Sequence, residues 1–236
     1  MDQMNREWVA NLERELRQRY ALLEERLEIG QLLVDVFVAT NIDELLEELI
    51  AKGDDHEDVL DERIPYFVDL WPSAIALAAY LESHPEEVKG KSVLEIGCGN
   101  GLAGVVAGLL GAASVTLTDY LPEALRFASL VWAKNIPQKA QTAILDWREP
   151  DPSLSSPLIL AADVAYEARN FQPLIQTFTQ LLLPGGHIIL TEPSRHIARD
   201  FFPMLNEAGF VIDHQHCPVS YKGIEHKVQL HRIYRP

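Results

Sequence analysis

Acidic residues and a glycine-rich turn stand at the ends of apolar, β-branched runs, where folded chains commonly place their chemistry. The run VLEI leads into GCGNG, and later apolar runs end at Asp119, Asp146 and Asp163. Glycines between a strand and a helix let the backbone approach a bound group, while the helix start offers unpaired N–H groups and a positive dipole end. This pattern predicts a site for a nucleotide-like cofactor.

The glycines alone do not say which cofactor binds. Gly99, Gly101 and Gly104 have the spacing G-x-G-x-x-G, and Asp119 follows at about the distance of a ribose-binding acid in dinucleotide sites. Four further features lie outside that fingerprint: Glu95 in the first strand, Asp146 with Trp147, Asp163 with Tyr166, and a terminal hairpin. A dinucleotide and a different cofactor therefore both stay open at this point.

The elements that position these residues alternate between strands and helices. Apolar runs predict strands over residues 93–96, 114–119, 140–145, 157–163 and 186–192. Helical patterns fall at 72–81, after the glycine turn, and at 122–135, 170–183 and 196–208. Such alternation predicts parallel β-α units with helices on both faces of the sheet.

The two ends of the chain depart from this alternation. Runs 209–217 and 225–234 are strand-like and too close together for an intervening helix, so they predict an antiparallel hairpin. At the other end, apolar residues at helical intervals predict an amphipathic helix over 8–27, followed by a strand over 29–39 and a helix over 42–52. We expect a doubly wound, Rossmann-like, mostly parallel α/β sheet that ends in an antiparallel hairpin and carries an N-terminal helical and strand extension.

The totals restrict the function classes. The 236 residues have a formal net charge of -15, which argues against a nucleic-acid partner because phosphate binding needs a basic face. The two cysteines form no disulfide framework, and we find neither a signal peptide nor an apolar run long enough to cross a bilayer. We expect a cytoplasmic protein without a membrane partner, and these features leave the oligomeric state open.

A family resemblance narrows the cofactor. VLEIGCGNG and the acid of LTDY resemble the S-adenosylmethionine motifs of seven-stranded methyltransferases, and the likeness extends from Val93 to the C-terminus. LWPSAIALAAYL, the DW after the third strand and AADVAYE look more narrowly like methyltransferase family 16. Its members include protein lysine methyltransferases, among them the one that acts on the electron transfer flavoprotein β subunit. Residues before Ile64 carry no such resemblance, so we expect an extension over 1–63 and a methyltransferase domain over 64–236.

The resemblance implies roles for individual residues. Asp119 would accept the ribose hydroxyls, Asp146 would accept from the adenine amino group, and Trp147 would offer a ring face beside the base. Glu95 would support the glycine turn or the cofactor amine, and Trp71 would close the pocket. The complete set of expected cofactor-binding residues is Trp71, Glu95, Gly97, Gly99, Gly101, Asp119, Asp146, Trp147 and Ala162. S-adenosylhomocysteine would be the product.

At the end of the fourth strand, Asp163 and Tyr166 are the expected catalytic residues. Transfer to a lysine requires an unprotonated amine, which a carboxylate and a phenol can hold and direct. We therefore expect methylation of a lysine in a protein or peptide. A small-molecule N- or O-methyltransferase, an NAD-dependent oxidoreductase and a non-catalytic binding module remain as alternatives. Glu192-Pro193-Ser194-Arg195 follows the next strand and is placed at the substrate entrance.

Two further groups carry no expected chemistry. His214 and His216 share one face of the terminal hairpin, with His226 and His231 across it, but their spacing matches no standard metal site. Cys98 has no evident base, so we interpret it as a small residue that fills the turn. We expect no metal.

Overall fold

The core of the structure is a seven-stranded sheet. The computed structural model describes residues 3–61 and 63–236, and its large sheet has the strand order β5-β4-β3-β6-β7-β11-β8. Neighbouring strands from β5 to β7 pair in parallel, whereas β11 pairs antiparallel with both β7 and β8. The strands are β3 (Ser92–Ile96), β4 (Ser114–Asp119), β5 (Gln141–Ile144), β6 (Ser156–Ala162), β7 (Leu182–Glu192), β8 (Val211–His216) and β11 (Gln229–Tyr234). The expected fold class is confirmed.

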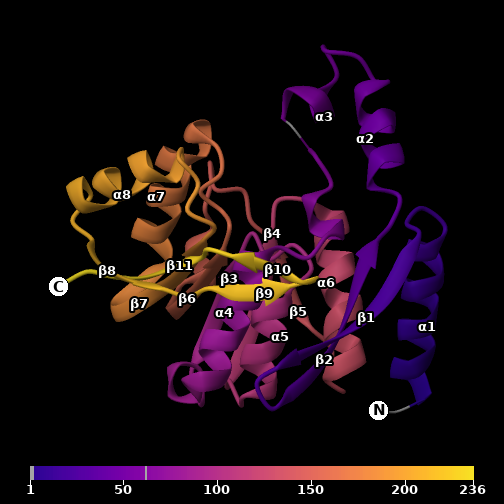
Figure 1. The fold of residues 1–236 in the computed structure, drawn as a ribbon, viewed down its shortest axis with the longest axis horizontal. Helices are drawn as coiled ribbons and strands as arrows, with labels where there is room; N and C mark the ends of the chain where they lie inside the picture. The colour runs from indigo at the N-terminus through magenta and orange to yellow at the C-terminus, as the bar shows by residue number, and fades with distance from the viewer. Residues whose placement is uncertain (1–2, 62) are drawn as a thin grey trace.

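Helices cover both faces of this sheet (Figure 1). One face carries α4 (Pro72–Ser83), α5 (Leu102–Leu109) and α6 (Pro122–Asn135), and the other carries α7 (Phe171–Leu181) and α8 (Ala198–Glu207). Two separate apolar clusters result, one under each helix layer. Short 3₁₀ turns join the elements: η1 (Tyr66–Val68), η2 (Pro85–Glu87), η3 (Pro152–Leu154) and η4 (Ala168–Asn170).

The terminal hairpin is present and carries a second hairpin at its tip. β8 and β11 pair antiparallel, with His231 opposite His214 and Gln229 opposite His216. The connection between them is not a plain loop, because β9 (Val219–Tyr221) and β10 (Ile224–His226) form a small two-stranded sheet. β11 therefore lies inside the large sheet and leaves β8 at the edge.

The N-terminal extension contains a hairpin where a longer helix was expected. The predicted helix is wrong after Arg17, because residues up to Leu27 lie in β1. The extension comprises α1 (Gln3–Arg17), β1 (Leu22–Ile29), β2 (Leu32–Ala39), α2 (Ile42–Ile50) and α3 (Glu57–Leu60). The hairpin turns at Gly30, whose φ is +57°, and a Cβ there would come within 2.0 Å of the Glu82 carboxylate. Antiparallel pairing of β1 with β2 along its whole length outweighs the helical spacing of the leucines.

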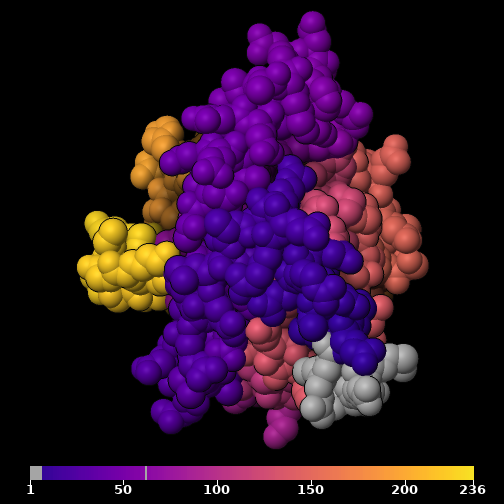
Figure 2. Space-filling model, turned by 90° about the vertical axis from the view of Figure 1, so that its right-hand side faces the viewer, coloured from indigo at the N-terminus to yellow at the C-terminus, as the bar shows by residue number. Residues whose placement is uncertain are grey.

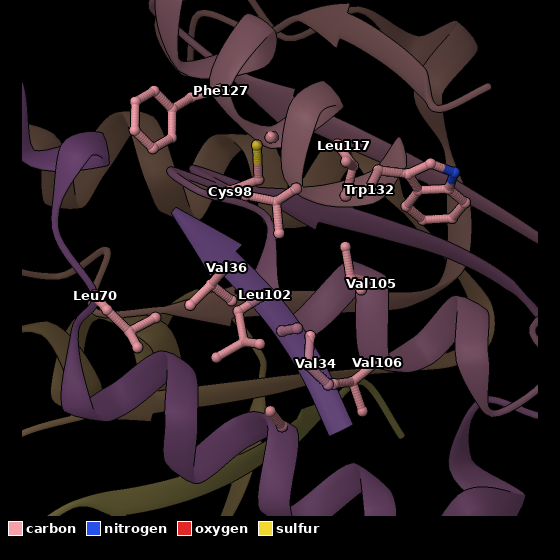
Figure 3. Packing of buried hydrophobic residues seen from close by; sticks show 14 of the residues in the cluster. Val34, Val36, Leu70, Cys98, Leu102, Val105, Val106, Leu117, Phe127 and Trp132 are labelled. Atoms are coloured by element: carbon pink, nitrogen blue, oxygen red, sulfur yellow. The ribbon is translucent and has the colours of Figure 1, made fainter. Parts of the chain in front are cut away.

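The extension packs on the helix layer of α5 and α6. Val34 and Val36 of β2 belong to the same buried cluster as Leu102 and Val106 of α5 (Figure 3). The side chain of Asn135 on α6 also bonds both the N–H and the C=O of Asp35, at 2.9 and 2.7 Å. Figure 2 shows the extension across the middle and top of one face, with later parts of the chain visible at both sides. α2 and α3 project from the top of the fold (Figure 1).

None of the helices in the described part of the chain is both long and apolar enough to span a bilayer.

Candidate active site

A cavity of about 590 Å³ opens where the parallel strands end at their carboxyl side. Its volume lies in the usual range for a site that binds a cofactor or small ligand. Most of the residues expected from the sequence line it: Trp71, Gly97, Gly99, Asp119, Asp146, Trp147, Ala162, Asp163 and Tyr166. Glu95 and Gly101 do not line it.

The glycine turn forms the floor of the cavity. Gly97 and Gly99 have φ values of +57° and +53°, in the left-handed region that favours glycine. A Cβ at Gly97 would lie 3.1 Å from both Trp147 and Val164, so the turn leaves no room for a side chain there. Between them, Cys98 is buried and burial raises the pKa of its thiol, which agrees with a packing role.

Glu95 lies beneath this turn rather than in the cavity. Glu95 is 2% exposed, and its carboxyl accepts a 2.8 Å hydrogen bond from the N–H of Gly104 in the first turn of α5. Burial raises the pKa of Glu95 to about 8. Of the two roles considered for this residue, its contacts favour support of the turn.

Asp119 joins the glycine turn to the loop after β4. One carboxylate oxygen accepts from the Gly99 N–H and the other from the Leu121 N–H, both at 3.0 Å. Burial raises the pKa of Asp119, and these backbone bonds oppose the rise. Because each oxygen can accept more than one hydrogen bond, the carboxylate can still receive two hydroxyl groups. Asp119 and the bare backbone of Gly97 therefore fit the nucleoside cofactor that the resemblance implies.

Asp146 has a partner that the sequence did not indicate. The guanidinium of Arg148 binds both carboxylate oxygens, with Nε 2.9 Å from Oδ1 and Nη2 2.7 Å from Oδ2. This hydrogen bonding to Arg148 holds the pKa of Asp146 below its usual value. The carboxylate is thus oriented in advance at the cavity wall.

Asp163 is paired with the guanidinium of Arg195 through both of its carboxylate oxygens. Nε and Nη2 of Arg195 lie 2.9 Å from Oδ1 and Oδ2 of Asp163, whose side chain is 7% exposed. Asp163 has a φ of +54° and donates its N–H to the C=O of Thr191. The carboxyl of Glu192 accepts from the N–H of Arg195 at 3.0 Å and anchors the loop. The sequence placed Arg195 at this edge but gave no sign of the pairing.

Three aromatic rings line the cavity beside this pair. The ring of Tyr66 lies 5.7 Å from those of Trp71 and Tyr166, in edge-to-face contact with each. The indole N–H of Trp71 also donates to the C=O of Tyr66 at 2.9 Å. Burial raises the pKa of Tyr166, so its phenol stays neutral. The carboxylate and the rings together suit a cationic or amine-bearing side chain.

The histidines of the terminal hairpin make no metal centre. Across residues 3–61 and 63–236, no three His, Cys, Asp or Glu side chains are grouped to hold a metal ion. His231 is instead buried and stacks on Phe202 with a ring separation of 4.0 Å.

Comparison with known proteins gives a family match and a set of relatives. A family model described as lysine methyltransferase matches residues 63–208. The protein N-lysine methyltransferase METTL21A of Danio rerio is 42% identical over 138 residues, which cover 56% of this chain and 62% of the relative. The EEF1A lysine methyltransferase 3 of Mus musculus is 31% identical over 169 residues, covering 69% of this chain and 70% of the relative.

The matched part thus spans less than two thirds of METTL21A from Danio rerio, and 65% of METTL21A from Xenopus tropicalis. Among solved structures, the N-methyltransferase NodS of Bradyrhizobium japonicum in complex with S-adenosyl-l-homocysteine aligns with a TM-score of 0.53. It is 19% identical, and the alignment covers 83% of this chain and 99% of NodS. This likeness confirms the fold.

Proposed function

Because this chain belongs to the lysine methyltransferase family, we propose that it transfers a methyl group from S-adenosylmethionine to the side-chain amine of a lysine in a protein. One observation carries the proposal. Asp163 and Tyr166 line the same cavity as the glycine turn and Asp119, so the expected acceptor site and the expected cofactor site are continuous. The formal net charge of -15 favours a protein over a nucleic acid as the acceptor.

The cofactor half of the site comprises the glycine turn and the walls beside it. Asp119 would bind the ribose hydroxyls and Asp146 the adenine amino group, each from a carboxylate already oriented by hydrogen bonds. Trp71, Trp147 and Ala162 contribute wall surface. Glu95 and Gly101 lie outside the cavity and would stabilise the glycine turn and the start of α5.

The acceptor half positions the amine and excludes water from it. When bound, the cofactor supplies an electrophilic methyl group on a positively charged sulfur, so the chain has mainly to align and desolvate a nucleophile. Asp163 keeps acceptor positions beyond the two that Arg195 fills. The neutral phenol oxygen of Tyr166 can also accept an N–H. Between them they would orient the free amine.

Labelled methyl transfer tests the proposal. The protein is incubated with S-adenosylmethionine carrying labelled methyl groups and a cell extract, and the labelled residue is identified by mass spectrometry. We expect label on a protein lysine. Label on arginine or on a small molecule would contradict the lysine acceptor. Cofactor binding by calorimetry but no labelled product would indicate a non-catalytic binding module, and binding of NAD alone would favour an oxidoreductase.

Variants of Asp163 separate chemistry from folding. Asp163→Asn keeps a residue type that tolerates the φ of +54° but removes the charge. Asp163→Ala removes the hydrogen-bonding group as well. We expect both to lose methyl transfer while retaining affinity for S-adenosylhomocysteine. Retained transfer in either variant would remove Asp163 from the catalytic role.

Both cysteines are free thiols. This state supports a reducing compartment, and we propose that the protein acts in the cytoplasm.

A further inference from the structure

Asp61, at the end of α3 in the extension, contacts residues that follow β4, β5 and β6. The hydroxyl of Tyr120, just after β4, donates to Oδ2 of Asp61 at 2.7 Å. Nη1 of Arg148, after β5, lies 3.2 Å from Oδ1. Arg169, in η4 after β6, donates to the backbone C=O of Leu60 and of Asp61, at 3.3 and 3.4 Å.

Two of these partners, Tyr120 and Arg148, are immediate neighbours of the two carboxylates expected to bind the cofactor. Tyr120 follows Asp119 in the chain, and Arg148 holds both oxygens of Asp146. Asp61 is therefore linked through Tyr120 to the expected ribose site and through Arg148 to the expected adenine site. It also lines the cavity itself.

A third arginine, Arg63 of the extension, completes the cluster. Nη2 of Arg63 bonds the Tyr120 hydroxyl at 3.0 Å, and the guanidinium groups of Arg63 and Arg148 lie 5.4 and 5.1 Å from the centre of the Tyr120 ring. The hydrogen bond from Tyr120 holds the pKa of Asp61 below its usual value, and the nearby Arg148 acts in the same direction. Asp61 is therefore charged at neutral pH and balances the arginines around it.

We propose that Asp61 is a positioning residue through which the N-terminal extension fastens the adenosine end of the cavity and slows release of the cofactor product. The inference rests on the proposed function, because the adenosine site is the one proposed above. The family model begins at residue 63, so this contact comes from a part of the chain that the model does not match. Arg148 is about half exposed, and bonds at such a rim are weak enough to open and close during turnover.

Dissociation of S-adenosylhomocysteine from the full chain tests this role. Trp71 and Trp147 line the cavity, so tryptophan fluorescence can follow release in a stopped-flow experiment. We expect Asp61→Ala to accelerate dissociation about tenfold, which corresponds to a barrier to release that is lower by about 1.4 kcal/mol. Tyr120→Phe removes only the hydroxyl and should accelerate dissociation about threefold, in line with one lost hydrogen bond.

The exposed acid Asp55, in the same extension, provides a control. It does not line the cavity, so Asp55→Ala should leave the dissociation rate unchanged. If Asp61→Ala releases product no faster than Asp55→Ala, the inference is wrong while the proposed function stands. Failure of the wild-type protein to bind S-adenosylhomocysteine would overturn both. The double variant Asp61→Ala/Tyr120→Phe should match Asp61→Ala alone, and a fully additive effect would show that the two residues act separately.

Discussion

The guanidinium of Arg195 pairs with both carboxylate oxygens of Asp163, with two nitrogen–oxygen distances of 2.9 Å. Asp163 is nearly buried, whereas the Arg195 side chain is 37% exposed and reaches it from the loop after β7. The hydrogen bonds that Arg195 donates to Asp163 raise the pKa of Arg195, so the arginine remains a permanent counter-charge. The proposed catalytic carboxylate therefore has a set orientation before any acceptor arrives.

Loss of this pairing should impair methyl transfer more than binding. In Arg195→Gln, the Asp163 carboxylate loses both charged hydrogen bonds and is left buried without a counter-charge. Such a carboxylate would hold an acceptor lysine in its protonated, unreactive form. We expect kcat to fall about 100-fold, at the lower end of the range of general acid–base effects, while KM for the acceptor does not rise.

The control for this variant is Arg199→Gln. Arg199 is an exposed arginine of α8 that does not line the cavity, and its replacement should leave kcat unchanged. A rise in KM with unchanged kcat in Arg195→Gln would show instead that Arg195 contributes only to acceptor binding.

Gly104 should not tolerate even an alanine. A Cβ there would lie 2.3 Å from the side chain of Leu117 and 2.5 Å from the carboxyl of Glu95, deep in the core. We expect Gly104→Ala to lower the free energy of unfolding by about 2–3 kcal/mol, as overpacked sites do. Gly209→Ala is a useful comparison, since φ is +87° but space is open, and it should cost about 1 kcal/mol. Equal midpoints of thermal unfolding for the two variants would contradict the packing argument.

Glu95 should make the stability of the apoprotein depend on pH. Burial raises its pKa in the folded chain from 4.5 to about 8, so between those values the folded state binds more protons than the unfolded state. The free energy of unfolding should therefore decrease as pH rises through this window, by at most about 1.4 kcal/mol for each pH unit.

Glu95→Gln keeps an oxygen for the Gly104 N–H and removes the titrating group. Urea denaturation at pH 5 and pH 8.5 should show a smaller difference for this variant than for the wild type. A difference of equal size would mean that Glu95 does not titrate in the window. The pKa of Asp119 is also raised by burial, but its contribution is present in both proteins.

At the opposite end of the sheet, Glu87 links three elements through a buried ion-pair network. One oxygen accepts from Arg232 of β11 and the other lies 2.9 Å from Nε2 of His187 on β7. Arg232→Met would leave the carboxylate of Glu87 short of its charged partner, at a cost of about 2 kcal/mol. Adding Glu87→Gln to the Arg232→Met variant should restore part of the lost free energy of unfolding. A double-mutant cycle of unfolding free energies measures the coupling, and strict additivity would contradict it.

The strand ends were predictable because apolar runs and their terminal acids are local features. Asp119, Asp146 and Asp163 each end or closely follow a strand, and parallel strands bring their carboxyl ends to one edge of the sheet. The glycine turn was similarly visible, because positive φ at Gly97 requires a residue type that the sequence displays.

The contacts between residues far apart in the chain were not predictable in the same way. Arg195 is 32 residues from Asp163, and Arg148 is 87 residues from Asp61. An arginine that forms such a pair follows no periodicity and resembles any surface arginine in the sequence. The helix expected over residues 8–27 was wrong for a related reason. Its leucines fit a helix and a strand alike, and the pairing of β1 with β2 decides between them.

The side-chain amide of Asn135 on α6 bonds the backbone of Asp35 and so attaches the N-terminal extension to the rest of the fold. The extension covers apolar side chains of α5 and α6, including Leu102 and Phe127, both fully buried. A fragment that begins at residue 63 would present that surface to water, and large exposed apolar patches promote self-association. The segment matched by the family model should therefore aggregate when it is expressed alone. The N-terminal extension, which that model does not match, keeps this apolar surface covered.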